Sequence, residues 1–422
     1  MKTKLLLTVL FCSPALVCPP VAAQSASAGA AVPDHYIVAL RPGAAPATVA
    51  ARHGLAPTFV YNAAMNGFAG FVPPGILRKL LTDPQVASVV PDREVVAFGK
   101  PVKPPPTPQP EVLPAGVSRV GGPIAVAGVG VAVVDTGLDM NHKDLLVSPE
   151  CYTAIVRTTG MDDNGHGTHV GGIIAAIDNE IDVVGVAPGA TLYAVKVLNR
   201  RGSGTDSTVI AGLDWIADNY NLVTPNIRVV NMSLGRPGTL TDQPAYRAAI
   251  QTLTESCSIT VVVAAGNDCN AEVSEMVPAC YPEVIAVAST AACDGASTYP
   301  GFSGIPKDTA SFFTTDGAEV CVSAPGEERE DVSADASITS IGILSTKLGG
   351  GTTRMSGTSM AAPHVAGVSA VIYAAGIQAT PDGVRRQITA DADGAGRVPQ
   401  PSPTECYTPD GFLEGVVQVP SN

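Results

Sequence analysis

The residue best placed for chemistry is Ser359, which follows the small-residue turn Ser356-Gly-Thr358 and opens an alanine-rich run that predicts a helix through Ala375. A hydroxyl in the first turn of a buried helix lies beside unpaired backbone N–H groups and a partial positive charge, which stabilise a developing anion. Pro363 is expected in the first helical turn, where proline is tolerated. A serine that only caps a core helix fits this stretch as well, so other residues must decide.

Two further candidates are suited to proton transfer. His166 stands between glycines, which let the backbone approach closely and aim the ring, at the start of the helix-like stretch 168–177. Asp135 ends the apolar run 129–134. A lone Asp-Thr-Gly is most simply a solvated turn. Aspartic proteases also carry this tripeptide, but they need two copies and the sequence has one.

Asn267 follows the apolar run 259–265, and its side-chain amide could donate a hydrogen bond to an oxyanion or belong to an ordinary turn. His166 and His169 could instead coordinate zinc. The pattern His-Glu-x-x-His is absent, however, and the neighbouring sequence offers no third ligand. We therefore interpret His169 as a buried structural histidine.

The amino-acid composition indicates a large buried core and argues against binding to nucleic acid. The chain has 422 residues, of which 45% are hydrophobic and 15% charged, so it is long enough for one large domain and a smaller one. A net charge of -13 argues against binding to phosphate backbones.

The first 28 residues predict a secretory signal peptide. Lys2 and Lys4 precede the apolar run 5–17, and small residues follow at Ala23 and Ala28. The run is too short for a transmembrane helix, and no second candidate span follows. Cys18 raises the alternative of a lipoprotein, but the bulky Val17 before it disfavours that interpretation. We expect a secreted protein without a stable membrane span.

Export makes disulfide bonds an expectation. Seven of the nine cysteines lie beyond the predicted signal peptide, so at least one of them is unpaired. Cys269 and Cys280 flank a short loop and could close it, while Cys280 with Cys321 is an equally good pairing.

Residues 34–98 predict a small independent unit. Their pattern is strand, helix, strand, strand, helix, strand, which indicates a ferredoxin-like α+β plait. Residues 99–111 follow as a proline-rich linker, expected to be extended, exposed and open to proteolysis.

Residues 112–395 predict a larger α/β unit, and a proline-rich tail of residues 396–422 completes the chain. Apolar runs alternate with helical patterns in the larger unit, which indicates a mostly parallel sheet covered by helices on both faces. Working residues in such sheets lie at the carboxyl ends of the strands.

The chain order Asp135, His166, Asn267, Ser359 joins these residues into one constellation. Three stretches resemble the signatures of the subtilisin-like serine proteases, or subtilases. They are Val133-Val-Asp-Thr-Gly137, Asn164-Gly-His-Gly-Thr-His-Val-Gly-Gly172 and Ser356-Gly-Thr-Ser-Met-Ala-Ala-Pro-His-Val-Ala-Gly367. An α/β-hydrolase would run Ser, Asp, His instead. The resemblance covers roughly residues 112–377, and the unit at 34–98 resembles that family's inhibitory propeptide.

The resemblance implies a role for each residue. Ser359 would be the nucleophile and His166 the general base and acid. Asp135 would orient the imidazole, and Asn267 with the Ser359 backbone N–H would form the oxyanion hole. No cofactor is implied for catalysis.

The resemblance also implies that a peptide substrate binds as an added strand. The implied substrate-binding residues are small or apolar, which favours large apolar or aromatic side chains in the first specificity pocket; they are Gly202, Ser203, Gly204, Ser233, Leu234, Gly235, Ala264 and Gly266. Arg236 departs from the family, which usually has a second glycine there, and could change the preference at the pocket rim.

A structural calcium ion is a further expectation from the resemblance. Its ligands would be oxygen atoms of Asp144, Ile177, Asn179, Ile181 and Val183. A solvated acidic loop is the alternative. A second calcium site of proteinase K-like relatives is expected to be lost, because Cys321 stands at its carboxylate position and a disulfide could replace that metal.

The expected function is a secreted serine endopeptidase that is made as a self-processing zymogen and acts as a monomer on protein or peptide substrates. Two alternatives stay open: a catalytically silent subtilase fold used for binding, and a processing protease with one dedicated substrate.

Overall fold

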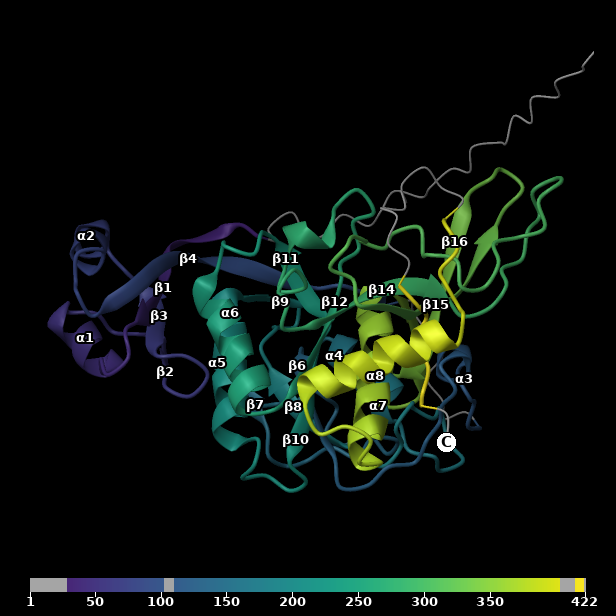
Figure 1. Cartoon of the computed structure of the whole chain (residues 1–422), viewed down its shortest axis with the longest axis horizontal. Coiled ribbons are helices and arrows are strands. Elements are labelled where there is room, and N and C mark those ends of the chain that lie inside the picture. Colours follow the sequence, from purple (N-terminus) through teal and green to yellow (C-terminus); the bar gives the residue numbers. More distant parts are fainter. Residues whose placement is uncertain (1–28, 102–109, 403–413, 421–422) are drawn as a thin grey trace, which may run out of the picture.

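The computed structural model describes residues 29–101, 110–402 and 414–420 (Figure 1). The predicted signal peptide, most of the proline-rich linker and the middle of the tail lie outside these residues. Within the described part of the chain, no helix has the length and apolarity needed to cross a membrane.

The N-terminal unit has the predicted order of elements. These are β1 (Ala31–Leu40), α1 (Pro46–Arg52), β2 (Phe59–Tyr61), β3 (Gly67–Phe71), α2 (Pro74–Leu80) and β4 (Val86–Ala97). The strands form an antiparallel sheet in the order β4-β1-β3-β2. Its core includes the buried side chains of Val38, Val49, Phe68 and Leu80, which lie at the spacing expected for one face of each element. This is the plait that the sequence indicates.

The larger unit is built around a ten-stranded sheet in the order β5-β17-β16-β15-β14-β12-β10-β6-β8-β7. Its strands are β5 (Lys100–Pro101), β6 (Gly130–Asp135), β7 (Tyr152–Thr153), β8 (Thr191–Lys196), β10 (Ile227–Met232), β12 (Thr260–Ala264), β14 (Ile285–Ala291), β15 (Val322–Val332), β16 (Ile338–Thr346) and β17 (Thr352–Ser356). Neighbouring strands from β15 to β7 are parallel, and those from β15 to β5 are antiparallel.

Helices surround this sheet, as Figure 1 shows. They are α3 (Ala115–Arg119), α4 (His166–Ala175), α5 (Asp206–Asn219), α6 (Pro244–Gln251), α7 (Thr358–Ala374) and α8 (Pro381–Gly394). Every residue of β6, β12 and β14 is buried, so both faces of these strands are covered. The predicted α/β architecture is confirmed.

The strand order reverses between β6 and β10. From β6 the chain moves to β8 on one side, and from β10 it moves to β12 and β14 on the other side. Ligands of open α/β sheets bind beyond the carboxyl ends of the strands at such a reversal. The fold therefore places the candidate site above β6, β10 and β12.

The C-terminal tail packs against the larger unit instead of standing apart from it. Val416 and Val417 are buried, and Val417 N–H donates to the Ser323 carbonyl. None of the six described cysteines forms a disulfide with another described cysteine, so neither expected pairing of Cys280 is observed.

Strand β15 carries two buried carboxyl groups, those of Glu327 and Glu330. Residues 294–307 and the hairpin of β15 and β16 enclose a small separate core that includes Ile305, Phe312 and Ile338. Glu327 accepts a hydrogen bond from Ser340 Oγ (2.7 Å), and Glu330 accepts one from the Phe312 N–H (2.9 Å). The second carboxyl oxygen of each glutamate is buried without a partner among the described residues.

This burial predicts that stability falls as the pH rises. Burial raises the pKa of Glu330 from its ordinary 4.5 to about 8. Burial and the neighbouring Glu330 also raise the pKa of Glu327. The folded chain thus holds a proton that the unfolded chain releases, so the free energy of unfolding decreases between about pH 4.5 and pH 8. We expect Glu330 alone to account for a loss of up to about 5 kcal/mol across this window, and Glu330→Gln should remove that share of the loss.

Urea unfolding at a series of pH values, in a chain made inactive by Ser359→Ala, measures this effect. Glu255→Gln is the control, because Glu255 is an exposed glutamate on the surface of the same unit. Equal pH dependence in the Glu330→Gln and Glu255→Gln chains would contradict the prediction.

Candidate active site

The last strand of the N-terminal unit continues into the larger unit and lies between two of its strands. On one side, β4 pairs antiparallel with β9 (Ser203–Thr205), with Val96 opposite Ser203. On the other side it pairs antiparallel with β11 (Leu234–Pro237), with Ala97 opposite Leu234. These two strands contain Ser203, Gly204, Leu234 and Gly235, half of the expected substrate-binding residues, so β4 occupies the groove where a substrate strand was expected.

Backbone hydrogen bonds extend this pairing to Phe98. Ala97 N–H donates to the Gly202 carbonyl (2.9 Å), and Phe98 N–H donates to the Ser233 carbonyl (3.3 Å). The Phe98 ring is buried against Gly235, where an added Cβ would lie 2.8 Å from two ring carbons. Glycine at 235 is therefore required for an aromatic side chain to occupy this pocket.

The backbone of residues 99–101, the start of the predicted linker, crosses the site. A Cβ on Gly99 would lie 3.0 Å from His166 Nε2, so the peptide bond between Phe98 and Gly99 passes beside the imidazole. Beyond it, β5 pairs antiparallel with β17, with Lys100 opposite Ser356. The chain is thus held on both sides of this one peptide bond.

Asp135 and His166 form a buried pair. Asp135 is the last residue of β6, and His166 is the first residue of α4. His166 Nδ1 lies 2.8 Å and 2.9 Å from the two Asp135 carboxylate oxygens. Burial lowers the pKa of His166, but the charge and hydrogen bond of Asp135 outweigh burial and raise the pKa overall. With Nδ1 donating to the carboxylate, Nε2 is left to accept a proton.

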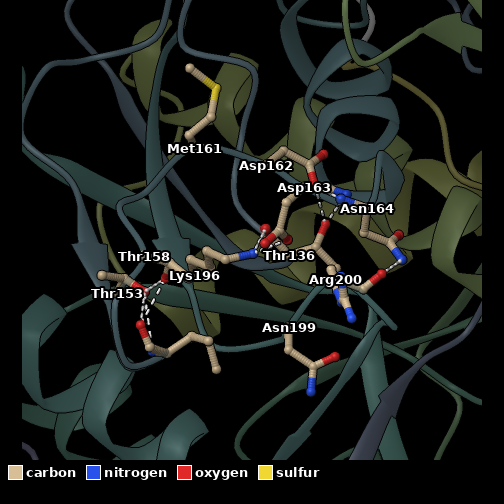
Figure 2. A network of polar contacts seen from close by, with 12 residues as sticks. Thr136, Thr153, Thr158, Met161, Asp162, Asp163, Asn164, Lys196, Asn199 and Arg200 are labelled. Atoms are coloured by element: carbon tan, nitrogen blue, oxygen red, sulfur yellow. Dashed lines mark hydrogen bonds and ion pairs between the residues drawn. The ribbon is translucent and has the colours of Figure 1, made fainter.

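A polar network holds this pair in place (Figure 2). Thr136 N–H donates to Asp135 Oδ1 (2.6 Å), and Thr136 Oγ1 donates to Asp162 (2.9 Å). Asp162 also accepts hydrogen bonds from the N–H and hydroxyl groups of Thr168 in α4 (3.0 and 2.6 Å). The fully buried Lys196 donates from Nζ to the Thr136 carbonyl (2.5 Å) and to Asp163 (2.6 Å). These contacts tie the end of β6 to the start of α4.

Ser359 lies at the start of α7 and is fully buried. Its hydroxyl donates to the Ser233 carbonyl (3.0 Å), while His166 Nε2 has no partner among the described residues. Gly99 lies against His166 Nε2, and this close approach accounts for the missing hydrogen bond between that nitrogen and Ser359.

Pro363 corrects one expectation. It lies inside α7 beyond the first turn, because the helix begins at Thr358. Proline has no N–H to donate to the carbonyl four residues earlier, which belongs to Ser359. Ser233 Oγ donates to that carbonyl instead (2.8 Å). Ser233, which directly precedes β11, thus compensates for the missing N–H of the proline.

Asn267 contacts the carbonyl of the bond that crosses the site. Its Nδ2 donates to the Phe98 oxygen (3.0 Å), and its Oδ1 accepts hydrogen bonds from the N–H and hydroxyl groups of Thr358 (both 2.9 Å). Gly357 allows the approach, because it has φ +149° and an added Cβ would lie 2.3 Å from the Phe98 oxygen. Asn267 is therefore oriented by Thr358 to donate to a carbonyl oxygen.

The structure places the remaining expected residues at the end of β12 and in α4. Ala264 ends β12 and is buried, and Gly266 N–H donates to Thr358 Oγ1 (3.2 Å). His169 is buried and donates from Nε2 to the Ile343 and Thr353 carbonyls (3.1 and 3.3 Å). That nitrogen is thus engaged with the backbone, as a structural histidine requires.

The expected calcium ligands also converge. Ile177 N–H donates to the Asp144 carbonyl (3.0 Å), Val183 N–H donates to Asp144 Oδ2 (3.3 Å), and Ile181 N–H donates to Asn179 Oδ1 (3.2 Å). Asp144 Oδ1 is buried without a partner among the described residues, and burial raises the pKa of Asp144 to about 7. Sequence reasoning missed Glu111, which accepts the Asn179 N–H (2.8 Å) and lies beside this cluster.

The N-terminal unit is held against α5 by carboxylates. Asp214 accepts backbone N–H groups of residues 62–64, the shortest at 2.7 Å. Asp92 accepts the Ser207 N–H (3.0 Å) and hydroxyl (2.6 Å). The unit that supplies β4 is therefore attached beside the groove by contacts of its own.

The site holds one peptide bond among an imidazole, a serine and an amide donor. On an α/β fold, this arrangement defines a hydrolase whose site is blocked by its own N-terminal unit. Two family matches agree with this arrangement. The subtilase family matches residues 127–405, and the peptidase inhibitor I9 family matches residues 35–97. The chain belongs to the subtilase family.

Individual relatives support the assignment. The chain is 36% identical over 272 residues to subtilisin DY of Bacillus licheniformis, covering 64% of this chain and 85% of the relative. It is 34% identical over 317 residues to subtilisin E of Bacillus subtilis (strain 168), covering 73% and 70%. It is 34% identical over 323 residues to a thermostable alkaline protease of Halalkalibacterium halodurans, covering 75% and 74%. The protein is thus a subtilisin-like serine endopeptidase with an inhibitory propeptide, made as a zymogen.

Proposed function

We propose that Ser359, His166 and Asp135 form the catalytic triad of a secreted endopeptidase, and that the first bond it hydrolyses is its own Phe98–Gly99 bond. The observation that supports this most directly is the 3.0 Å hydrogen bond from Asn267 Nδ2 to the Phe98 carbonyl oxygen. A donor at that oxygen stabilises the oxyanion that forms when a nucleophile attacks the carbonyl carbon.

The proposed reaction has two steps. Ser359 Oγ attacks the Phe98 carbonyl carbon while His166 Nε2 takes the hydroxyl proton, and Asn267 and the Ser359 N–H stabilise the oxyanion. The imidazolium then gives the proton to the Gly99 nitrogen, the C–N bond breaks, and an acyl-enzyme on Ser359 remains. Water attacks the acyl-enzyme with His166 again as base, which releases the Phe98 carboxylate and restores the serine.

The propeptide strand suggests the substrate preference. Phe98 fills the first pocket, and Ala97 and Val96 precede it along the groove. We therefore propose a broad preference for aromatic and large apolar residues before the cleaved bond. A processing protease with one substrate and a silent binding protein are the outcomes that the next experiment distinguishes.

Intact-mass analysis and N-terminal sequencing of the folded wild-type chain test this function. We expect a new N-terminus at Gly99, together with stoichiometric labelling of one serine by a fluorophosphonate. A chain that stays uncut and unlabelled would show a silent fold. Labelling with cleavage of only one protein in a proteome-wide substrate screen would show a dedicated processing protease.

Asn267→Leu is expected to lower kcat for peptide hydrolysis by about 10²- to 10³-fold with little change in KM. This magnitude is the one known for the corresponding donor in subtilisin. The reason is that Asn267 acts on charge that develops only in the transition state. Asn219→Leu, at the end of α5, is the control for loss of an amide elsewhere. An equal fall in kcat for both variants would contradict the role of Asn267.

We also propose that Asp144, Asn179 and the carbonyls of residues 177, 181 and 183 hold a structural Ca²⁺ ion, with Glu111 as a further oxygen ligand. The unpartnered, buried Asp144 Oδ1 fits such an ion, because a cation offsets the cost of burying a carboxylate. No cluster of three His, Cys, Asp or Glu ligands is found in the described ranges, so backbone and amide oxygens would supply most of the coordination.

Calcium at 100 times its Kd is expected to raise the free energy of unfolding of the Ser359→Ala chain by about 2.7 kcal/mol. Asp144→Asn should remove most of this gain, and acidification below about pH 7 should weaken binding because Asp144 is then protonated. Titration calorimetry and thermal unfolding measure both effects, with the exposed Asp393→Asn as the control. Equal calcium stabilisation in the Asp144 and Asp393 variants would contradict the site.

Secretion and a monomeric state complete the proposal. The apolar run at residues 5–17 supports secretion. Recovery of the protein from the culture medium tests secretion, and sedimentation of the secreted protein tests the oligomeric state.

A further inference from the structure

The largest fully buried side chain of the described residues is a charged one. Arg236 has no exposed side-chain surface, and neither has its partner Asp206. Arg236 Nε donates to Asp206 Oδ1 (3.0 Å), and its terminal nitrogen donates to Asp206 Oδ2 (2.8 Å). Arg236 thus turns away from the pocket rim, where the sequence placed it, into a two-pronged ion pair.

This pair joins the two strands that hold the substrate. Arg236 belongs to β11, and Asp206 follows directly after β9 as the first residue of α5. Because β4 lies between β9 and β11, the two strands are about 10 Å apart, twice the spacing of paired strands. The ion pair therefore spans the width of the groove.

Further contacts place the pair beneath β4. Gln243, which precedes α6, donates from Nε2 to Asp206 Oδ2 (3.2 Å) and to the carbonyl of Pro91 in β4 (3.4 Å). Arg236 also donates to the Pro237 carbonyl (2.9 Å). The pair is thus hydrogen-bonded to the end of β11 through the Pro237 carbonyl. Gln243 links it to β4 through the Pro91 carbonyl.

A buried ion pair is a costly way to hold two elements together. The desolvation of both charges offsets most of their attraction, and apolar replacements of similar size are often neutral or stabilising. The two strands also have to keep their separation after the propeptide leaves, when no strand lies between them. A rigid arginine fork suits this task, because its geometry fixes both distance and direction.

We propose that the Arg236–Asp206 pair is a positioning pair that sets the width of the groove for the residues two to five positions before the cleaved bond. The inference rests on the proposed function. Groove width matters only for substrates long enough to pair with both strands, since the contacts described above for Phe98, the residue in the first pocket, are with Ser233, Gly235 and Asn267. The pair should therefore act on long substrates and leave short ones unaffected.

The test compares two chromogenic anilides on the matured enzyme, one with acyl-Glu-Val-Val-Ala-Phe, which reproduces residues 94–98, and one with acyl-Phe alone. The variant is the double replacement Arg236→Met with Asp206→Leu, which leaves no unpaired charge. The control is Arg247→Met with Glu283→Leu, which removes an ion pair (2.8 Å) that lies away from the groove.

We expect the double variant to lower kcat/KM about 10- to 100-fold on the long substrate and to leave the short one within about twofold. The control should change neither. An equal loss of kcat/KM on both substrates, together with a lower unfolding temperature, would mean that the pair is merely structural and would overturn the inference. An unchanged ratio of kcat/KM between the long and the short substrate would overturn it as well. Should the double variant fail to mature, Arg236→Lys, which keeps the charge but not the fork, must show the same selective loss. Failure of the wild type to hydrolyse either substrate would reject the proposed function instead.

Discussion

A chain that carries Ser359→Ala is expected to keep its propeptide and to hydrolyse peptide substrates about 10⁶-fold more slowly than the wild type. This magnitude is that of the same replacement in subtilisin. Without Oγ no acyl-enzyme can form, and the bond between Phe98 and Gly99 stays intact even though Asn267 still contacts its carbonyl. Binding and the oxyanion hole alone leave a residual rate about 10³- to 10⁴-fold above that in water.

Intact mass and steady-state kinetics with the pentapeptide anilide measure both effects. Ser274→Ala is the control, because Ser274 is an exposed serine in a short turn of the same unit. Self-processing of the Ser359→Ala chain in a preparation free of other proteases would show that another group is the nucleophile.

The catalytic candidates were predictable because each follows a local rule. Asp135 ends β6 and Asn267 follows β12, both parallel strands of the sheet, while His166 and Ser359 lie in the first turns of α4 and α7. The carboxyl ends of parallel strands meet at one edge of a sheet. Their order along the chain then distinguished one family from the others. The plait of the N-terminal unit was also predictable, because its helices and strands show regular apolar periodicity.

Contacts between distant segments were not predictable in this way. Nothing around Phe98 in the sequence indicates that its carbonyl meets Asn267, since the two residues are far apart in the chain and are joined only by the docking of two units. The same holds for Arg236, whose partner Asp206 lies thirty positions earlier. Arg236 stands where the family usually has a glycine, and only the fold shows that its guanidinium group pairs with Asp206.

The position of Pro363 was mispredicted for a related reason. Local rules favour proline in the first turn of a helix, but the start of α7 is fixed by the tight turn at Gly357 that lets the Phe98 carbonyl approach. The unpaired carbonyl that results is satisfied by Ser233, a residue far away in the sequence. Tertiary contacts thus decided what the local pattern could not.

Asp135→Asn is expected to lower kcat by about 10⁴-fold while leaving the fold and substrate binding intact. Asp135 accepts a hydrogen bond from His166 Nδ1 at 2.8 Å, which keeps Nε2 unprotonated and facing the peptide bond. An asparagine can turn its amide N–H groups toward Nδ1. The imidazole would then carry its proton on Nε2, where it cannot take one from Ser359.

The pH profile gives this prediction a second, independent readout. The Asp135 carboxylate raises the pKa of His166 against the opposing effect of burial. The wild type should therefore lose kcat/KM as the pH falls through this raised pKa, and the residual activity of the variant should lose it only at lower pH. The exposed Asp393→Asn should move neither kcat nor the profile. If Asp135→Asn lowers kcat but leaves the acid limb where it is in the wild type, Asp135 acts on the geometry of the site and not through the imidazole.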